Sequence, residues 1–198
     1  MVFTQEAAVP VLHSRKRSPF KGNHMEEILT GIGAFGILVL FEYQKCRNVR
    51  QNKKGRNPWF LLGMLLLIGA FVMEAVKDEA SQGIRLAAGI GILAAGLAFY
   101  AAVLGIAVGK QGYTEDLMGT TVSRKGMYGH VRHPGVWSFL VCALGYGMIF
   151  PEGMGLALGF AFLNLIYTWL QDRYFFPVYL AGYEEYKKEV PYLVPRRK

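Results

Sequence analysis

Residues 135–170 read GVWSFLVCALGYGMIFPEGMGLALGFAFLNLIYTWL. The stretch consists of two apolar runs, 135–150 and 154–170, which are separated only by the tripeptide Pro-Glu-Gly at 151–153. A link of this length joins two helices into an antiparallel hairpin. The polar segments on the two sides of the hairpin are therefore expected to emerge at the same end of it.

The rest of the chain supplies three more apolar runs. About 20 helical residues cross a bilayer, and about 17 are a practical lower limit. The second and third runs meet this length, and the others are close to the limit. We therefore expect an all-α fold, a polytopic membrane helix bundle of about five transmembrane helices that ends in the hairpin. The three further runs are 28–43, 58–76 and 84–108.

The composition agrees with a membrane protein of one domain, because 53% of the 198 residues are hydrophobic and 18% are charged. The formal net charge of +8 does not indicate nucleic-acid binding. The basic residues lie in loops and tails between apolar runs, where anionic lipid is the simpler partner. We expect a single domain over 25–198. The first 24 residues are predicted to be a disordered basic tail, or an upstream extension if the natural start is Met25.

The distribution of basic residues predicts the orientation of the helices. The first and third connections and the C-terminal tail are rich in lysine and arginine, whereas the hairpin turn has no basic residue. Since cytoplasmic loops carry the excess of positive charge, the C-terminus and both flanks of the hairpin are predicted to be cytoplasmic. The basic N-terminal tail opposes this orientation. Either a start at Met25 or a first run that does not cross fully would resolve the conflict.

Two further patterns are interpreted as structural. The string GIGAFG at 31–36 satisfies the spacing of a dinucleotide-binding loop, but it lies inside a membrane run with no strand before it. Cys46 lies in a basic loop and Cys142 in an apolar run, so we expect neither a disulfide nor a zinc site. No metal-binding residue is predicted.

The chemically informative residues lie on the two polar flanks of the hairpin. Ionisable groups at the border of a membrane helix are costly to desolvate and often mark a functional site. The hairpin predicts that Arg132 and His133 lie near Asp172 and Arg173 in space. Cations, one carboxylate and several aromatic rings suit a zwitterionic ligand that bears a purine. The alternative is that the basic residues meet lipid phosphates and that tyrosines and tryptophans form an interfacial belt.

The residue spacing on the first flank resembles the signature of the isoprenylcysteine carboxyl methyltransferase and phospholipid methyltransferase superfamily. In this chain the pattern reads Gly126-x-Tyr128-x-x-Val131-Arg132-His133-Pro134-x-x-Trp137. The second flank is similar to the tail of that family in the spacing of Tyr183, Tyr186, Val190-Pro191 and Pro195. The resemblance covers about residues 84–195.

The resemblance implies an integral membrane enzyme that uses S-adenosylmethionine to methylate a lipophilic or amphiphilic acceptor, such as an isoprenylcysteine carboxylate or a phospholipid amine. A cytosolic tail would fold over the site, and Asp172 would give the cofactor an acidic contact. Arg132 and His133 are the expected catalytic residues. Arg132 could hold an acidic head group, and His133 would line the cofactor pocket or act as the base for an amine acceptor. The implied cofactor-binding residues are Gly126, Met127, Tyr128, Arg132, His133, Pro134, Trp137, Asp172, Tyr183 and Tyr186.

Three departures from the family pattern bear on activity. The Glu-Glu pair of the family is Gln171-Asp172 here, Leu180 stands at the position of the tail glycine, and Trp137 replaces a tyrosine. One alternative is therefore a non-catalytic membrane protein of the same fold that binds lipid or a partner helix. Another is a small transporter, which would place polar residues inside the apolar runs. Asn164 is the main residue of that kind in the last three runs.

Overall fold

The computed structural model of the chain describes residues 24–51, 58–75 and 126–195, together with the isolated positions 83, 87, 89–91, 94, 122 and 124. These residues contain helices and no β-strand, so the all-α class is confirmed for them. The predicted tail, apart from His24, lies outside the described residues. So does most of the third apolar run, of which positions 87, 89–91 and 94 are described and helical.

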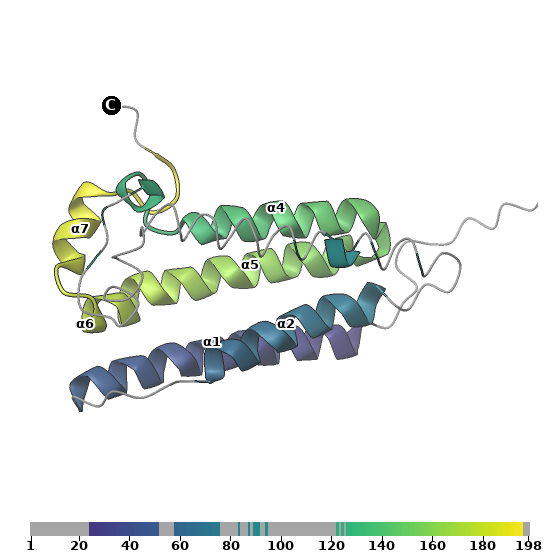
Figure 1. The fold of residues 1–198 in the computed structure, drawn as a ribbon, viewed down its shortest axis with the longest axis horizontal. Helices are drawn as coiled ribbons and strands as arrows, with labels where there is room; N and C mark the ends of the chain where they lie inside the picture. Colours follow the sequence, from purple (N-terminus) through teal and green to yellow (C-terminus); the bar gives the residue numbers. More distant parts are fainter. Residues whose placement is uncertain are drawn as a thin grey trace, which may run out of the picture.

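Two long helices precede the hairpin in the described parts of the chain. Helix α1 spans Met25–Arg50 and helix α2 spans Trp59–Ala75. Glutamates in the first turn of α1 and arginines in its last turn have the signs that the helix dipole favours. The two helices lie side by side in opposite directions on one side of the molecule (Figure 1).

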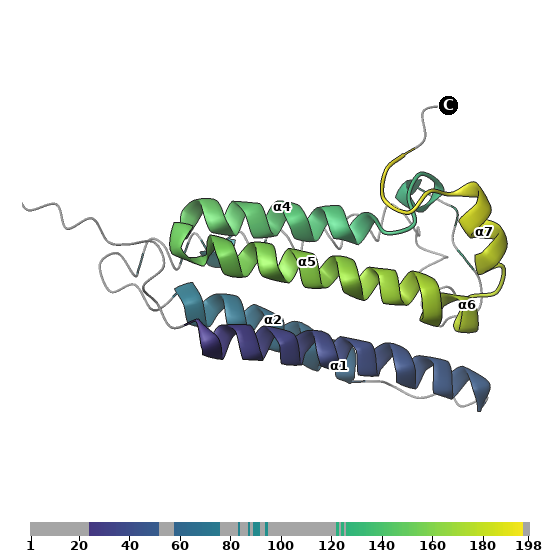
Figure 2. The same cartoon turned by 180° about the vertical axis from the view of Figure 1, so that it is seen from behind.

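The predicted hairpin is confirmed. Helix α4, Pro134–Ile149, is joined to helix α5, Met154–Leu170, by the short 3₁₀ turn Pro151–Gly153. Helix α4 begins with Pro134, whose fixed φ suits a first helical position. The two helices run antiparallel above the α1–α2 pair, as two opposite views show (Figures 1 and 2).

The chain continues from α5 into the polar flank without leaving the helix. A π-helical turn, Gln171–Phe175, leads into the short helix α6, Phe176–Tyr179, and then into α7, Tyr183–Glu189. Between α6 and α7 Gly182 takes a left-handed conformation with φ of 77°, which glycine adopts at little cost. A 3₁₀ turn, Gly126–Gly129, precedes α4 at the same end of the molecule (Figure 1).

Aromatic rings form the contact between the two helix pairs. Phe35 of α1 packs against Phe160 of α5 and Phe139 of α4, and Phe71 of α2 packs against Phe160 and Tyr146. The Tyr146 hydroxyl donates a 2.8 Å hydrogen bond to the Phe71 carbonyl, so its polar end is satisfied within the core.

The glycine string at 31–36 has a packing role at its first position. A Cβ added at Gly31 would overlap the ring of Phe160, whereas one added at Gly33 or Gly36 would meet nothing within 4 Å. Gly31 therefore lets α5 approach α1 closely, as small residues do in membrane helix packing.

One helix among the described residues is long and apolar enough to cross a membrane. It runs from Pro151 to Tyr179 over 29 residues with a mean hydropathy of 1.5. Helices α2 and α4 are also apolar but have 17 and 16 residues. A single spanning helix is weak evidence for membrane association, so five crossings and their orientation stay predictions.

Candidate functional site

An ion pair joins the two flanks at the open end of the hairpin. The Arg132 guanidinium binds the Asp172 carboxylate through two bonds, Nε to Oδ1 at 2.8 Å and Nη2 to Oδ2 at 3.1 Å. Both side chains are largely buried, with 11% and 12% of their area exposed. The two-pronged geometry is the strong form of this pair. The predicted proximity of Arg132 to Asp172 is thus confirmed, whereas Arg173 is exposed at the same end.

His133 reaches the same carboxylate from the next position along the chain. Its Nε2 lies 3.2 Å from Asp172 Oδ1, and its ring stacks on Phe176 and meets the edge of Tyr192. Burial lowers the pKa of His133 below 6.5, and this effect exceeds the opposing attraction of Asp172. A neutral imidazole donates through one nitrogen only, so the proximity to Oδ1 indicates that Nε2 carries the hydrogen.

Tyr183 completes the contacts of Asp172 from the tail. Its hydroxyl donates a 2.6 Å hydrogen bond to Asp172 Oδ1. Burial, followed by this bond, raises the pKa of Tyr183 well above its ordinary value, so the hydroxyl remains a donor. Tyr186 in the same helix donates a 2.6 Å hydrogen bond to the Tyr128 carbonyl, and burial raises its pKa as well. These two tyrosines attach α7 to the hairpin and to residues 126–133, which carry the Arg-His pattern and are called the motif loop below.

Backbone and side-chain bonds hold the end of the tail against the motif loop. The Arg132 Nη1 donates to the Val190 carbonyl at 2.6 Å and to the Lys187 carbonyl at 3.1 Å, at the C-terminal end of α7. The amides of Arg132 and His133 donate to the Pro191 and Tyr192 carbonyls at 3.0 and 3.3 Å. The tail therefore lies over the motif loop, as expected.

The remaining predicted cofactor residues differ in exposure. Trp137 is 43% exposed, and its Nε1 donates a 2.9 Å hydrogen bond to the Leu193 carbonyl. Gly126 is exposed with a positive φ of 57°, and Met127 and Tyr128 are half-buried. Pro134 is buried as the first residue of α4. The residues of the pattern that could meet a ligand from outside are thus Trp137 and the turn that begins at Gly126.

The sequence did not predict a second buried carboxylate at this end of the molecule. Glu42 of α1 is 2% exposed and accepts hydrogen bonds from Gln171 Nε2 at 2.6 Å, Tyr179 at 2.7 Å and Tyr167 at 3.0 Å. Gln171 and Asp172 are neighbours in the π-helical turn but point in different directions: Gln171 contacts α1, and Asp172 contacts the motif loop. An acid near the end of an apolar run was the available signal, but its partners were not visible in the sequence.

The described residues line cavities beside the tail and at the end of α1. A cavity of about 520 Å³ is lined by Tyr183, Glu184, Glu185, Val49 and the segment from Pro177 to Gly182. A second, of about 210 Å³, lies between the end of α1 and the π-helical turn and is lined by Tyr43, Cys46, Arg47, Arg50, Gln51, Tyr174, Phe175 and Val178. Arg132 and His133 line neither of them. The larger cavity has the volume of a small-molecule site, and Tyr183 separates it from Asp172.

The cluster around Asp172 is satisfied by the chain itself. Arg132 uses its Nε, Nη1 and Nη2 atoms within the protein, and both oxygens of Asp172 are engaged. The exposed indole of Trp137 and the half-buried ring of Tyr128 are the aromatic groups that would suit the purine and the cation of the expected cofactor. The ion pair between Arg132 and Asp172 holds the motif loop, the hairpin and the tail together.

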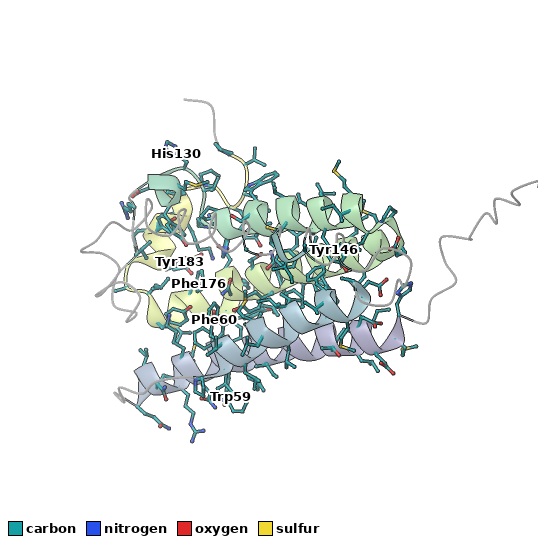
Figure 3. The ribbon with its side chains drawn as sticks, turned by 45° about the vertical axis from the view of Figure 1, so that its right-hand side comes forward. Trp59, Phe60, His130, Tyr146, Phe176 and Tyr183 are labelled. Atoms are coloured by element: carbon teal, nitrogen blue, oxygen red, sulfur yellow. The ribbon has the colours of Figure 1, made fainter. Side chains whose placement is uncertain are left out.

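In Figure 3 Tyr183 and Phe176 lie at the same end of the molecule as His130, and Tyr146 lies far from them.

Comparison with known proteins gives no assignment, because no family model, no curated protein and no solved structure matches the chain.

Proposed function

We propose that the protein is a methyltransferase that works at the membrane, with S-adenosylmethionine as methyl donor and a lipophilic or amphiphilic acceptor. The observation that supports this proposal is that the motif loop, the hairpin and the tail, which carry the three parts of the family pattern, meet at one carboxylate. Asp172 of the hairpin contacts Arg132 and His133 of the motif loop and Tyr183 of the tail. Residues so far apart in the chain form one cluster, as a shared site requires.

The proposed roles follow from exposure and contacts. Asp172 acts as a positioning residue, because it fixes Arg132, His133 and Tyr183 and has both oxygens engaged. Trp137 and Tyr128 offer aromatic faces to a purine or a sulfonium. When bound, the cofactor supplies a methyl group already activated on sulfur. The protein then contributes orientation and exclusion of water.

His133 is proposed to line the cofactor pocket, and a proton-accepting role arises only for an amine acceptor. Its lowered pKa keeps the imidazole neutral near pH 7, as a base requires. A carboxylate acceptor needs no base, because it is already ionised. The pH dependence of the rate separates these two acceptor classes.

The membrane setting is supported by the outer surface of the helices. Large apolar side chains are exposed on α1, α2, α4 and α5, among them Leu29 at 60%, Leu61 at 63%, Val141 at 64%, Met148 at 78% and Phe162 at 62%. Many large apolar side chains exposed on several helices are costly in water and are typical of a bundle that faces lipid. We propose a multi-pass protein whose Arg132 end faces the cytoplasm, where the basic connections lie.

A second candidate function is a non-catalytic protein of the same fold. The observation in its favour is that Arg132 and Asp172 satisfy each other, which leaves no carboxylate of the Gln171-Asp172 pair for an ammonium group. Such a protein would bind lipid or a partner helix through the same apolar surface.

Cofactor binding distinguishes the two functions. The full chain in detergent is titrated calorimetrically with S-adenosylhomocysteine. Trp137→Ala is the test variant, because its indole is exposed and its removal leaves the ion pair in place. We expect binding by the native protein and at least a tenfold weaker affinity in the variant. Folded protein that binds nothing contradicts the proposal and favours the non-catalytic function.

Methyl transfer is tested with radiolabelled donor and a total lipid and small-molecule extract. We expect label transfer by the native protein and a loss of about 100-fold in His133→Ala, the scale of a lost acid–base or positioning contribution. The matched control is His130→Ala, which removes an exposed histidine three residues earlier. Equal labelling by His133→Ala and native protein contradicts the site assignment.

A further inference from the structure

Three side chains of types that can bind metals lie close together at the end of the molecule opposite Arg132. They are His24, which precedes α1, Glu27 in the first turn of α1, and Glu74 near the end of α2. The ligand atoms of the three all lie within 4.8 Å of one another. His24 and Glu27 are three positions apart, so the start of α1 presents both on one face.

Burial makes this group unlike a surface cluster of acids. Glu27 is 0% exposed and Glu74 is 3% exposed, whereas His24 retains 22% of its side-chain area in contact with solvent. Two buried carboxylates at this separation repel each other, and removing each of them from water costs several kcal/mol. A positive charge placed between them would reduce this repulsion.

The set of donors specifies what kind of charge fits. One imidazole nitrogen and two carboxylate oxygens are the ligands that zinc and neighbouring divalent transition metals accept. Such a cation offsets both carboxylates at once, whereas an imidazolium offsets only one. His24 Nδ1 already lies 2.9 Å from Glu74 Oε2, and its partial exposure gives an entry path.

The geometry needs only a small adjustment. Ligands of a tetrahedral zinc ion lie roughly 3.5 Å from one another, since each bond is about 2.0–2.2 Å. The present separations, from 2.9 Å to at most 4.8 Å, bracket that value. Metal binding therefore requires changes of about 1 Å in the distances between these atoms.

We propose that His24, Glu27 and Glu74 form a binding site for a divalent transition metal, with zinc as its best occupant. The metal clamps the start of α1 to the end of α2, and water completes its coordination. The site lies near the hairpin turn, because a Cβ added at Gly153 would lie 3.1 Å from Glu74 Cγ, beside Tyr146. It is separate from the proposed methyl-transfer site and does not depend on that function.

The experiment uses the full chain in detergent, without a histidine tag, after treatment with a chelator. Zinc chloride is titrated calorimetrically, and bound zinc is counted by elemental analysis after dialysis. We expect one zinc per chain, at least tenfold weaker binding in His24→Ala and in Glu74→Gln, and unchanged binding in His130→Ala. Magnesium should bind far more weakly, because it prefers oxygen ligands to imidazole.

Melting temperature provides a second measurement. Zinc should raise the melting temperature of the native protein and of His130→Ala, and it should leave that of His24→Ala unchanged. His24→Ala is the key variant, because its side chain is the most exposed of the three and its removal is the least harmful to folding. Absence of stoichiometric zinc, or equal binding by folded His24→Ala and native protein, overturns the proposal. In that case a proton or another group of the chain holds the carboxylates together.

Discussion

At the scale of single residues, Asp172 is the centre of the candidate site. Its carboxylate accepts from a guanidinium and a tyrosine hydroxyl and lies within hydrogen-bond distance of an imidazole. The three partners come from the motif loop and the tail, so a single carboxylate fixes the position of both. Networks of this kind respond strongly to the loss of one member, because the others are left buried and unsatisfied.

Replacement of Asp172 by asparagine should destabilise the protein by about 3–5 kcal/mol, because it leaves the Arg132 charge buried without its partner. The free energy of unfolding is measured by denaturant titration in detergent. The control is Glu189→Gln, which breaks the exposed pair between Arg124 and Glu189, whose atoms lie 2.6 Å apart. An exposed pair contributes about 1 kcal/mol or less. Equal losses in both variants would show that the Asp172 pair does not hold the tail.

His133 should make stability depend on pH in the acidic range. Its pKa in the folded protein lies below 6.5, so as the pH falls below 6.5 the unfolded chain takes up a proton that the folded chain does not. Stability is therefore full above pH 6.5 and decreases on acidification, by up to about 1.4 kcal/mol per pH unit for one proton. Comparison of unfolding at pH 7 and pH 5 should show a smaller decrease in His133→Gln than in native protein. His130→Gln should retain the native decrease, and a loss of the effect there would refute the assignment.

At the scale of the elements, close contact between α1 and α5 depends on a residue without a side chain. The ring of Phe160 occupies the space where a Cβ on Gly31 would lie. The glycines at 33 and 36 have no such neighbour among the described residues. The resemblance of this string to a nucleotide-binding loop is therefore explained by packing at one of its positions.

Replacement of Gly31 by alanine should cost about 1–3 kcal/mol, because the new methyl group forces Phe160 or α5 to move. Gly33→Ala is the matched control, since it adds the same methyl group in open space, and the higher helix propensity of alanine makes it neutral or slightly stabilising. Thermal unfolding of both variants in detergent measures the difference. A Gly31→Ala variant as stable as Gly33→Ala would contradict the described packing.

At the scale of the whole molecule, the sequence predicted the arrangement that a short connection imposes on two helices. It did not predict which faces of the helices contact one another. The three-residue link at 151–153 admits one arrangement of the helices beside it, and the meeting of Arg132 with Asp172 follows from that hairpin. The apolar runs are apolar on all sides, so they do not reveal which face of α1 meets α5 or α2. Glu42 lies on such a face, and its partner Gln171 is 129 positions away in sequence. Glu27 lies on another, near Glu74 of α2.

The lipid-facing surface gives a prediction for the intact protein. Phe162 lies in the middle of α5 and is 62% exposed. A variant whose only tryptophan replaces Phe162, reconstituted into vesicles with brominated acyl chains, should have strongly quenched fluorescence, because in the proposed membrane span this side chain would face the bilayer core. A tryptophan at the exposed Glu185 of α7 should escape quenching. Equal fluorescence from the two positions would argue against a membrane span in α5.

The extra residue in the π-helical turn has a mechanical consequence. Gln171 and Asp172 are adjacent in sequence, yet one is bound to the first helix and the other to the loop before α4. One turn of backbone therefore joins the Asp172 ion pair to Glu42, which is 129 positions from Gln171. Deleting a single residue there would rotate everything beyond it by about 100°, and the two ends of this linkage would lose register together.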